Sequence, residues 1–275
     1  LVAPSVEFKV TGVYEGMTVE VTTFNAYVER TIKLPEGVDP HRITTGVVVD
    51  PDGTVRHVPT RISVVDGSYY ATINSLTNSA YSVVWHPLEF ADAADHWAKE
   101  SVNDMGSRMV VEGEDDGLFH PDRNVTRAEF AAIVIRGLGL PQQAGASSFP
   151  DVLAADWFTG AVNTAYAYGL IDGMDDGSYR PNDNITREQA MTIVARASEI
   201  TGLAKTLSER SAMETLSAFA DASAVSGWAA SSVSAALQAD IVNGRGDAEL
   251  APQAFMTRAE VAAVIQRLLQ RSGLI

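Results

Sequence analysis

The 275-residue sequence contains no cysteine. This absence excludes disulfide bonds, thiolate catalysis and zinc sites built on cysteine. The sequence also has no apolar run of about 18 residues, so it predicts no transmembrane helix and no membrane insertion. The opening stretch LVAPSVEFKV has neither a basic region nor a long apolar core. We therefore expect a mature fragment or a piece of a longer protein here, and not a signal peptide.

Basic side chains are scarce as well. The 20 Lys and Arg residues face 35 Asp and Glu residues, which gives a formal net charge of −15. Phosphate contacts require a basic face, so this balance disfavours nucleic acid as a partner. An anionic ligand would have to be held by local groups and not by the global field.

The first 87 residues predict β-structure. Stretches such as TVEVTTF, ITTGVVVD and AYSVVW are rich in β-branched and aromatic residues, and VDGSYY contains an Asp-Gly turn signal. About seven short strands with frequent turns indicate an all-β, sandwich-like module over residues 1–87.

After residue 88 the sequence becomes helical in its periodicity and repeats three times. We predict three units, over residues 88–140, 147–202 and 217–275, with a linker over 203–216. One tryptophan, one glycine and one threonine recur in each unit, with 16 residues from Trp to Gly and 13 from Gly to Thr. They are Trp97, Gly113 and Thr126 in the first unit, Trp157, Gly173 and Thr186 in the second, and Trp228, Gly244 and Thr257 in the third.

Each unit predicts a helix, a loop and a second helix. The first helix is expected to run for about four turns from the tryptophan, with the glycine as its C-terminal stop. Two helices cannot bury an apolar face alone, so the units must share a core. The expected fold is multi-domain, an N-terminal β-sandwich-like domain followed by an all-α, pseudo-threefold trimer of helix-loop-helix units.

The second helix of each unit opens on a Thr-Arg pair. The threonine and the Glu or Gln three residues later match a capping box. The arginine lies beside the positive end of the helix dipole, which is unfavourable unless an anion is near. Two explanations stay open, a guanidinium that binds a ligand carboxylate or phosphate and a salt bridge to a neighbouring unit. The three arginines are Arg127, Arg187 and Arg258.

The tryptophans also allow two interpretations. Each follows an aspartate by a few residues and lies near a predicted helix start. The rings could pack between units, or they could form a partly exposed wall that stacks on a sugar. The aspartates are Asp92, Asp151 and Asp221.

These motifs resemble one known family. The pattern F-x-D…W, the G-x-x-x-G loop followed by an aromatic and Pro, and the segments NVTRAEF and NITREQA are similar to the S-layer homology (SLH) domains of bacterial cell-envelope proteins. The resemblance covers residues 90–275 as three tandem units. The β module is similar, less specifically, to modules that precede SLH units in large exported enzymes and surface proteins, and it assigns no activity.

The resemblance implies a secreted protein held non-covalently at the bacterial cell wall or surface layer. The ligand would be a peptidoglycan-linked, anionic secondary cell-wall polysaccharide bearing ketal-linked pyruvate, bound in grooves between units. The chain would be a monomer with an internal pseudo-trimer, no cofactor and no metal, and any catalytic activity would lie in other parts of its parent protein.

The resemblance also implies which residues bind the ligand. The motif arginine would meet the pyruvate carboxylate. The third unit departs from the pattern at Arg245, Glu249 and Leu250, so its groove is expected to bind weakly or not at all. The implied ligand-binding residues are Asp92, Trp97, Gly113, Thr126, Arg127, Asp151, Trp157, Gly173, Thr186, Arg187, Asp221, Trp228, Gly244, Thr257 and Arg258.

Other functions remain as alternatives. The pairs Asp115–Asp116 and Asp175–Asp176 could suggest an enzyme, but they precede glycine and recur as turn residues. The five histidines show no i, i+4 pair, so no catalytic and no metal-binding residue is predicted. A calcium-dependent or purely structural S-layer assembly module is the remaining alternative, although the acidic loops lack EF-hand spacing.

Overall fold

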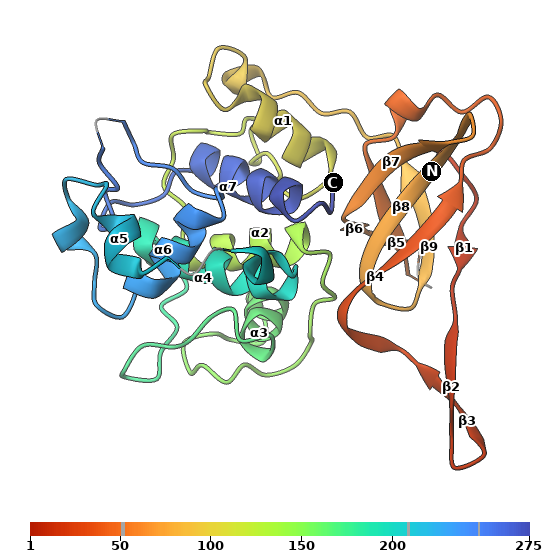
Figure 1. Ribbon diagram of the computed structural model, residues 1–275, viewed down its shortest axis with the longest axis horizontal. Helices are drawn as coiled ribbons and strands as arrows, with labels where there is room; N and C mark the ends of the chain where they lie inside the picture. The colour runs from red at the N-terminus through yellow and green to blue at the C-terminus, as the bar shows by residue number, and fades with distance from the viewer. Residues whose placement is uncertain (51–52, 208–209, 247) are drawn as a thin grey trace.

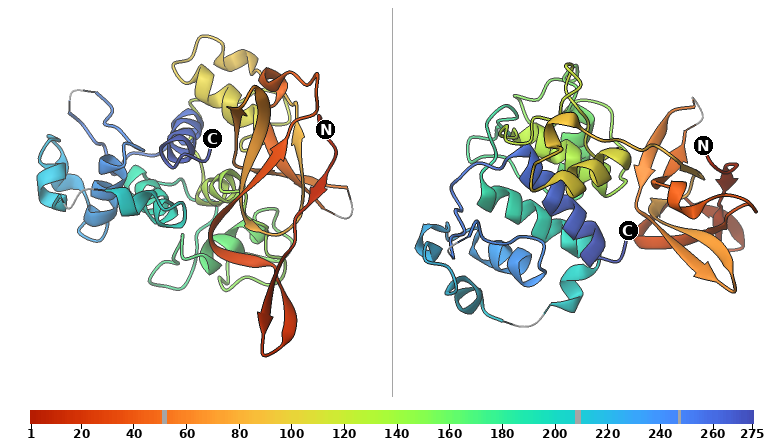
Figure 2. Two further views of the ribbon diagram at one scale, coloured as in Figure 1. Left: turned by 45° about the vertical axis from the view of Figure 1, so that its right-hand side comes forward. Right: turned by 90° about the horizontal axis from the view of Figure 1, so that it is seen from above.

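The computed structural model of the chain describes residues 1–50, 53–207, 210–246 and 248–275. It consists of a β-sheet part followed along the chain by a helical part (Figure 1). The two parts lie side by side, and the hairpin of β2 and β3 projects away from both (Figure 2).

The β part contains nine strands among the described residues, not the predicted seven or so. A four-stranded sheet has the order β1-β9-β5-β6, and a three-stranded sheet has the order β4-β8-β7. All paired strands are antiparallel. The strands are β1 (Val6–Glu7), β2 (Val10–Tyr14), β3 (Met17–Val21), β4 (Thr23–Lys33), β5 (Thr45–Val49), β6 (Val55–Val58), β7 (Thr60–Val65), β8 (Ser68–Thr77) and β9 (Ala80–Val84).

Two of these sheets share an apolar core. Ile32 and Ile73 come from the three-stranded sheet, and Val48, Val58 and Tyr81 come from the four-stranded sheet, and all five are buried together. Along β4, Ile32 lies between the exposed residues Thr31 and Lys33, as expected for a strand with one face turned inward. The central strand β8 is instead buried on both faces around Ile73.

The helical part contains seven α-helices among the described residues. Within that described part, none of them is long and apolar enough to cross a membrane. The helices are α1 (Lys99–Ser107), α2 (Arg127–Gly137), α3 (Thr159–Ala167), α4 (Arg187–Ile200), α5 (Ala212–Leu216), α6 (Ala230–Gln238) and α7 (Arg258–Arg271). Short 3-10 helices span Pro40–Arg42, Ala91–Ala93, Leu203–Thr206 and Ala222–Ala224.

The predicted capping boxes are confirmed in all three units. The Thr126 side chain accepts a hydrogen bond from the Glu129 amide, and the Glu129 side chain accepts one from the Thr126 amide. The same reciprocal pair joins Thr186 to Gln189 at α4 and Thr257 to Glu260 at α7.

The units are connected in a cycle. The first helix of each unit packs on the last helix of another unit. Helix α1 packs on α7, α3 packs on α2, and α6 packs on α4. The segments that enter the last helices also pair with one another through isolated antiparallel bridges. These bridges join Asn124 to Thr257, Thr126 to Asn184 and Thr186 to Phe255.

The predicted fold class is wrong in describing this part as an all-α trimer of helix-loop-helix units. Helices alternate with long loops, the loops pair through β-bridges, and the third unit follows an additional helix, α5. The physical reason is that buried loop residues continue the apolar pattern. Val110 and Val111 are buried beyond the end of α1, so the periodicity made that helix look longer than it is.

The predicted helix stop is also wrong. The first helix of each unit ends well before the motif glycine. The second residue after each of these helices is left-handed, namely Met109, Gly169 or Asp240, with φ angles of 62°, 66° and 55°. Left-handed residues of this kind end helices, and Met109 shows that glycine is not required for it. The motif glycine therefore does not end the helix but lies in the loop that follows it, where it has a different structural role.

The β part and the helical part are joined by hydrogen bonds at helix C-termini. The Tyr27 hydroxyl donates to the Leu138 carbonyl at 2.6 Å, and Arg56 Nη1 donates to the Gly139 carbonyl at 2.6 Å. Carbonyls at the end of a helix have no partner within it. The β part supplies two such partners to the end of α2.

Candidate ligand-binding site

The three motif arginines are buried side chains that reach into a neighbouring unit. Their exposed fractions are 7% for Arg127, 3% for Arg187 and 8% for Arg258. In each case Nε donates to a loop carbonyl of another unit. The acceptors are Tyr179 for Arg127 at 2.8 Å, Leu250 for Arg187 at 2.9 Å and Phe119 for Arg258 at 2.6 Å.

The backbone around each arginine explains how a cation is tolerated at a helix start. The amide of Arg127 donates to the Asp183 carbonyl and the next amide donates to the Pro181 carbonyl. The third amide, that of Glu129, is taken by Thr126. The same bonds recur at α4 and α7. These helix amides therefore already have partners, which leaves the guanidinium group as the candidate to meet an anion at each helix start.

The terminal guanidinium nitrogens differ between the three sites. Arg187 forms an ion pair with Glu260 at 3.1 Å, which is the salt bridge between units that the sequence allowed. Arg258 donates from Nη2 to the Glu112 carbonyl at 2.6 Å. The two terminal nitrogens of Arg127 have no hydrogen-bond partner among the described residues. Burial lowers the pKa of all three arginines from the usual range, so a neighbouring anion would stabilise their charged form.

The predicted aspartates hold the loops in place. Both carboxylate oxygens of Asp92 accept backbone hydrogen bonds, from the amides of Phe119 and His120. Asp151 and Asp221 make the equivalent bonds in the other units. Burial alone would raise the pKa of Asp92 and Asp221, but these backbone donors outweigh it and lower the pKa. The aspartates thus fix the carbonyls that the arginines bind.

The motif glycines allow close packing inside the loops. A Cβ on Gly173 would lie 2.8 Å from a ring carbon of Phe149 and 3.1 Å from the Ser178 carbonyl oxygen. Gly113 and Gly244 are crowded in the same way, by Phe90 and Phe219. A side chain at this position would push the loop away from the aromatic ring beneath it.

The tryptophans are the predicted residues that face solvent. Trp97 and Trp157 are each 64% exposed and Trp228 is 61% exposed. Their large apolar faces are not used by the core, which leaves them free to stack on a ligand.

One hollow of about 470 Å³ brings predicted residues of all three units together. It contains Gly113 from the first unit, Trp157 from the second and Arg258 from the third. Its volume is in the usual range for small-molecule sites. The complete lining is Val111, Glu112, Gly113, Glu114, Arg123, Glu129, Ile133, Arg136, Trp157 and Arg258.

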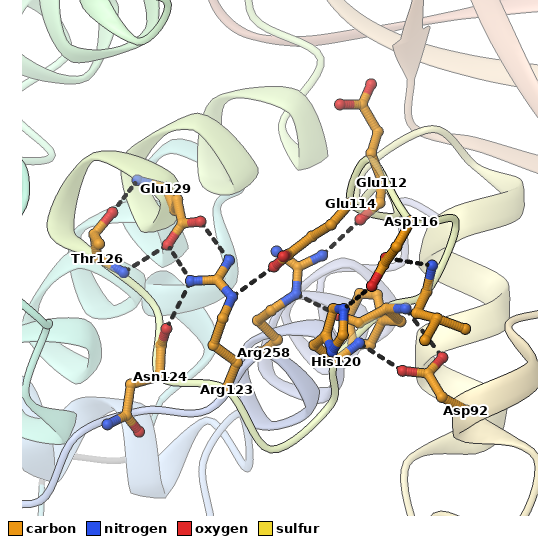
Figure 3. A network of polar contacts seen from close by, with 12 residues as sticks. Asp92, Glu112, Glu114, Asp116, His120, Arg123, Asn124, Thr126, Glu129 and Arg258 are labelled. Carbon is orange, nitrogen blue, oxygen red and sulfur yellow. Dashed lines mark hydrogen bonds and ion pairs between the residues drawn. The ribbon is translucent and has the colours of Figure 1, made fainter.

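The hollow is polar, and its arginines other than Arg258 form ion pairs with glutamates. Arg123 lies between Glu114, at 2.6 Å, and Glu129, at 2.5 Å (Figure 3). Arg136 pairs with Glu112 at 3.0 Å. Burial would raise the pKa of Glu129, but the hydrogen bonds from Arg123 and Thr126 lower it. The hollow therefore offers both cations and acceptors to a hydroxylated, anionic ligand.

The same cyclic contacts bring corresponding residues together at two further places between units, which we also call grooves. Arg127 bonds to the loop that contains Gly173, and α6, which follows Trp228, packs on α4. Arg187 bonds to the Asn243 carbonyl next to Gly244, and α1, which follows Trp97, packs on α7. We name the three after the unit whose loop lines them, so that the hollow is the unit-one groove.

The sequence did not point to Arg123, Glu129 or Arg136 as site residues. Glu129 was assigned to the capping box, a role that it fills while also lining the hollow. Arg136 has counterparts ten residues after each motif threonine, Arg196 and Arg267, and this spacing could have revealed it. Arg123 has no such counterpart. Among the described residues, no group of three or more His, Asp or Glu side chains could hold a metal ion.

Comparison with known proteins identifies the repeated units. The family model of the S-layer homology domain matches residues 89–131, 148–191 and 218–262. An amylopullulanase of Thermoanaerobacterium thermosulfurigenes is 34% identical over 90% of this chain and 13% of its own length. That match of 246 residues is too long for the helical part alone, so it extends into the β part.

Two further relatives match a smaller share of the chain. The exoglucanase XynX of Acetivibrio thermocellus is 37% identical over 72% of this chain and 18% of its own length. A surface-layer 125 kDa protein of Lysinibacillus sphaericus is 32% identical over 63% of this chain and 14% of its own length. The chain thus spans less than a fifth of each of these proteins.

Proposed function

Because the chain carries three domains of the S-layer homology family, we propose that it anchors a secreted bacterial protein non-covalently to the cell wall. It acts as a binding module and not as an enzyme. Its relatives support this role, because two polysaccharide-degrading enzymes and a surface-layer protein share this module although the rest of each chain differs in function.

The ligand in this proposal is an anionic, pyruvate-bearing polysaccharide of the cell wall. The observation that carries it is the unit-one groove, where Trp157, Arg258 and Gly113 meet from three units. The exposed indole of Trp157 stacks on a sugar ring. A carboxylate on that sugar is attracted by Arg258, whose guanidinium is desolvated and paired only with carbonyls.

Co-sedimentation with purified cell-wall sacculi tests the anchoring role. Trp157→Ala removes a stacking face from an exposed position, so the fold should be unchanged and the bound fraction should fall. Trp85→Ala is the matched control, because Trp85 is 48% exposed and lies on the β part. Equal loss of binding in both variants would show that Trp157 has no specific role.

The anionic character of the ligand is tested with matched glycan fragments. A fragment with a free ketal-pyruvate carboxylate should bind about 10- to 150-fold more tightly than its methyl ester, which corresponds to one charge-assisted hydrogen bond. Equal affinity of acid and ester would exclude the carboxylate as the partner of the arginines. Titration in the presence of a calcium chelator separates this proposal from a calcium-dependent module.

A further inference from the structure

The three grooves do not carry the same charges, although their backbones correspond. In the unit-one groove Arg136 pairs with Glu112, the residue before the motif glycine. In the unit-two groove Arg196 pairs in the same way with Asp172, at 2.5 Å. In the unit-three groove the residue before the glycine is Asn243, and the matching Arg267 has no ion pair within the described residues. One cation is thereby left uncompensated in the unit-three groove.

A second arginine distinguishes the same groove. Arg245 follows the motif glycine and binds the capping-box residue Glu260 through Nε and Nη2, each at 2.7 Å. Its Nη2 also donates to the Phe255 carbonyl. In the unit-one groove, Arg123 binds the capping-box residue and a carbonyl two residues before the motif threonine in the same manner.

Arg123 and Arg245 thus place a guanidinium group at the same position of their respective grooves, although they occupy different positions in the sequence repeat. Arg123 lies ten residues after its motif glycine, whereas Arg245 lies one residue after. The unit-two groove has Met174 and Asp183 at these two positions and Gln189 in the capping box. It therefore lacks both the guanidinium and the glutamate.

The balance of charges separates the unit-three groove from the others. In the unit-one groove Arg123 is shared by two carboxylates, Glu114 and Glu129. In the unit-three groove the single carboxylate of Glu260 is shared by two arginines, Arg187 and Arg245. The unit-one groove contains three arginines, Arg123, Arg136 and Arg258, and three glutamates, Glu112, Glu114 and Glu129. The corresponding positions of the unit-three groove hold three arginines, Arg187, Arg245 and Arg267, and one glutamate, Glu260.

We propose that the unit-three groove, lined by Arg187, Arg245, Glu260 and Arg267, is the strongest of the three sites for an anionic glycan. This inference rests on the proposed function, and it reverses the expectation drawn from the sequence, in which the altered third loop binds weakly. Arg245 is the specificity-determining residue, since it adds a guanidinium next to a motif arginine in a groove with an excess of cations.

The indole N–H signals of the tryptophans can report on each groove separately. Trp157 lines the unit-one groove. From the contacts of α1 with α7 and of α6 with α4 we infer that Trp97 lies at the unit-three groove and Trp228 at the unit-two groove. Trp85 on the β part serves as reference. The probe is the methyl glycoside of N-acetylmannosamine carrying a ketal-linked pyruvate, titrated into the nitrogen-labelled full chain. The Trp97 signal should move at the lowest probe concentration.

Two exchanges test the role of Arg245. Arg245→Met introduces the residue of the unit-two groove and should weaken the response of Trp97 about 10- to 100-fold, while that of Trp157 is unchanged. Met174→Arg should strengthen the response of Trp228. Asn243→Asp supplies a partner for Arg267 without altering the bonds of Arg245, so it should also weaken the response of Trp97 even if Arg245→Met perturbs the loop.

The outcomes separate this inference from the proposed function. A first response at Trp157 or Trp228, or an unchanged response of Trp97 in folded Arg245→Met and Asn243→Asp, overturns the ranking of the grooves. If neither the probe nor its methyl ester changes any indole signal, or if the acid and the ester give equal responses, the proposal of an anionic ligand is itself overturned.

Discussion

Arg127 and Tyr179 hold each other across two units of the helical part. Arg127 Nε donates to the Tyr179 carbonyl at 2.8 Å, and the Tyr179 hydroxyl donates back to the Arg127 carbonyl at 2.9 Å. The guanidinium carbon also lies 4.8 Å from the centre of the tyrosine ring. The arginine is therefore part of the contact between units as well as a candidate ligand group, and experiments have to separate these two roles.

Replacing Arg127 by alanine should destabilise the fold. The change leaves the Tyr179 carbonyl without its donor in a buried place, which costs about 1–3 kcal/mol. Urea unfolding measures the loss. Tyr179→Phe is the matched comparison, because it removes only the hydroxyl bond and should cost about 1 kcal/mol. The first unit already has Phe119 at this position, bound to Arg258 without a hydroxyl. An Arg127→Ala variant as stable as the wild type would show that the contact contributes nothing.

Gly173→Ala should disturb the loop of the second unit. The new Cβ would lie 2.8 Å from a ring carbon of Phe149 and 3.1 Å from the Ser178 carbonyl oxygen. Because both the ring and the backbone are packed, we expect a loss of about 1–3 kcal/mol in the free energy of unfolding. Gly227→Ala is the control, since a Cβ there meets no atom within 4 Å and should change stability little. Equal stability of both variants would contradict the close-packing role.

His57 should make the protein less stable in mild acid. Its ring is 3% exposed, Nδ1 lies 2.7 Å from Thr45 Oγ1, and Nε2 has no partner among the described residues. Burial, together with the charge of Arg108, lowers the pKa of His57 to about 3. The unfolded chain takes up this proton near pH 6.5, so stability present above that pH is lost as the pH falls towards 3.

The expected loss from His57 is roughly 2 kcal/mol between pH 6.5 and 5. Urea unfolding at several pH values in this window measures it, and His57→Leu should remove most of the slope. His41→Gln is the control, because the side chain of His41 is exposed. A slope that persists in His57→Leu would assign the pH dependence to other groups.

Tyr27→Phe combined with Arg56→Ala should lower the melting temperature of the whole chain. The two changes remove the donors for the Leu138 and Gly139 carbonyls at the end of α2, each bond being worth about 1 kcal/mol. Tyr14→Phe, on the exposed hairpin of β2 and β3, should have no effect. An unchanged melting temperature in the double variant would mean that these bonds do not couple the two parts.

The same junction bears on the predicted domain boundary at residues 87 and 88, which stays a prediction. A fragment of residues 88–275 should keep wall binding, because all three grooves lie within it. It should unfold at a lower temperature than the full chain, since it loses the cover of α2. Wall binding by residues 1–87 alone would contradict this division.

Local relations in this protein could be predicted from the sequence because their partners are close along the chain. Thr126 and Glu129 are three residues apart, and one helical turn brings them together whatever surrounds them. The three repeated units follow from fixed spacings in the same way. The length of α1 could not be predicted, because Val110 and Val111 are buried in the core of the helical part although they lie in a loop, so the apolar pattern continues past the end of the helix.

Only the tertiary structure decided where the arginines bind. Arg258 meets Phe119 across 139 residues, and the choice between a carbonyl, a carboxylate and a ligand depends on which loop lies there. Arg123 and Arg245 make equivalent contacts in two grooves. They do not align in the sequence repeat, so their equivalence becomes visible only in the structure. The free energy of a charged side chain depends on the groups around it in space, and in this chain those groups come from different units.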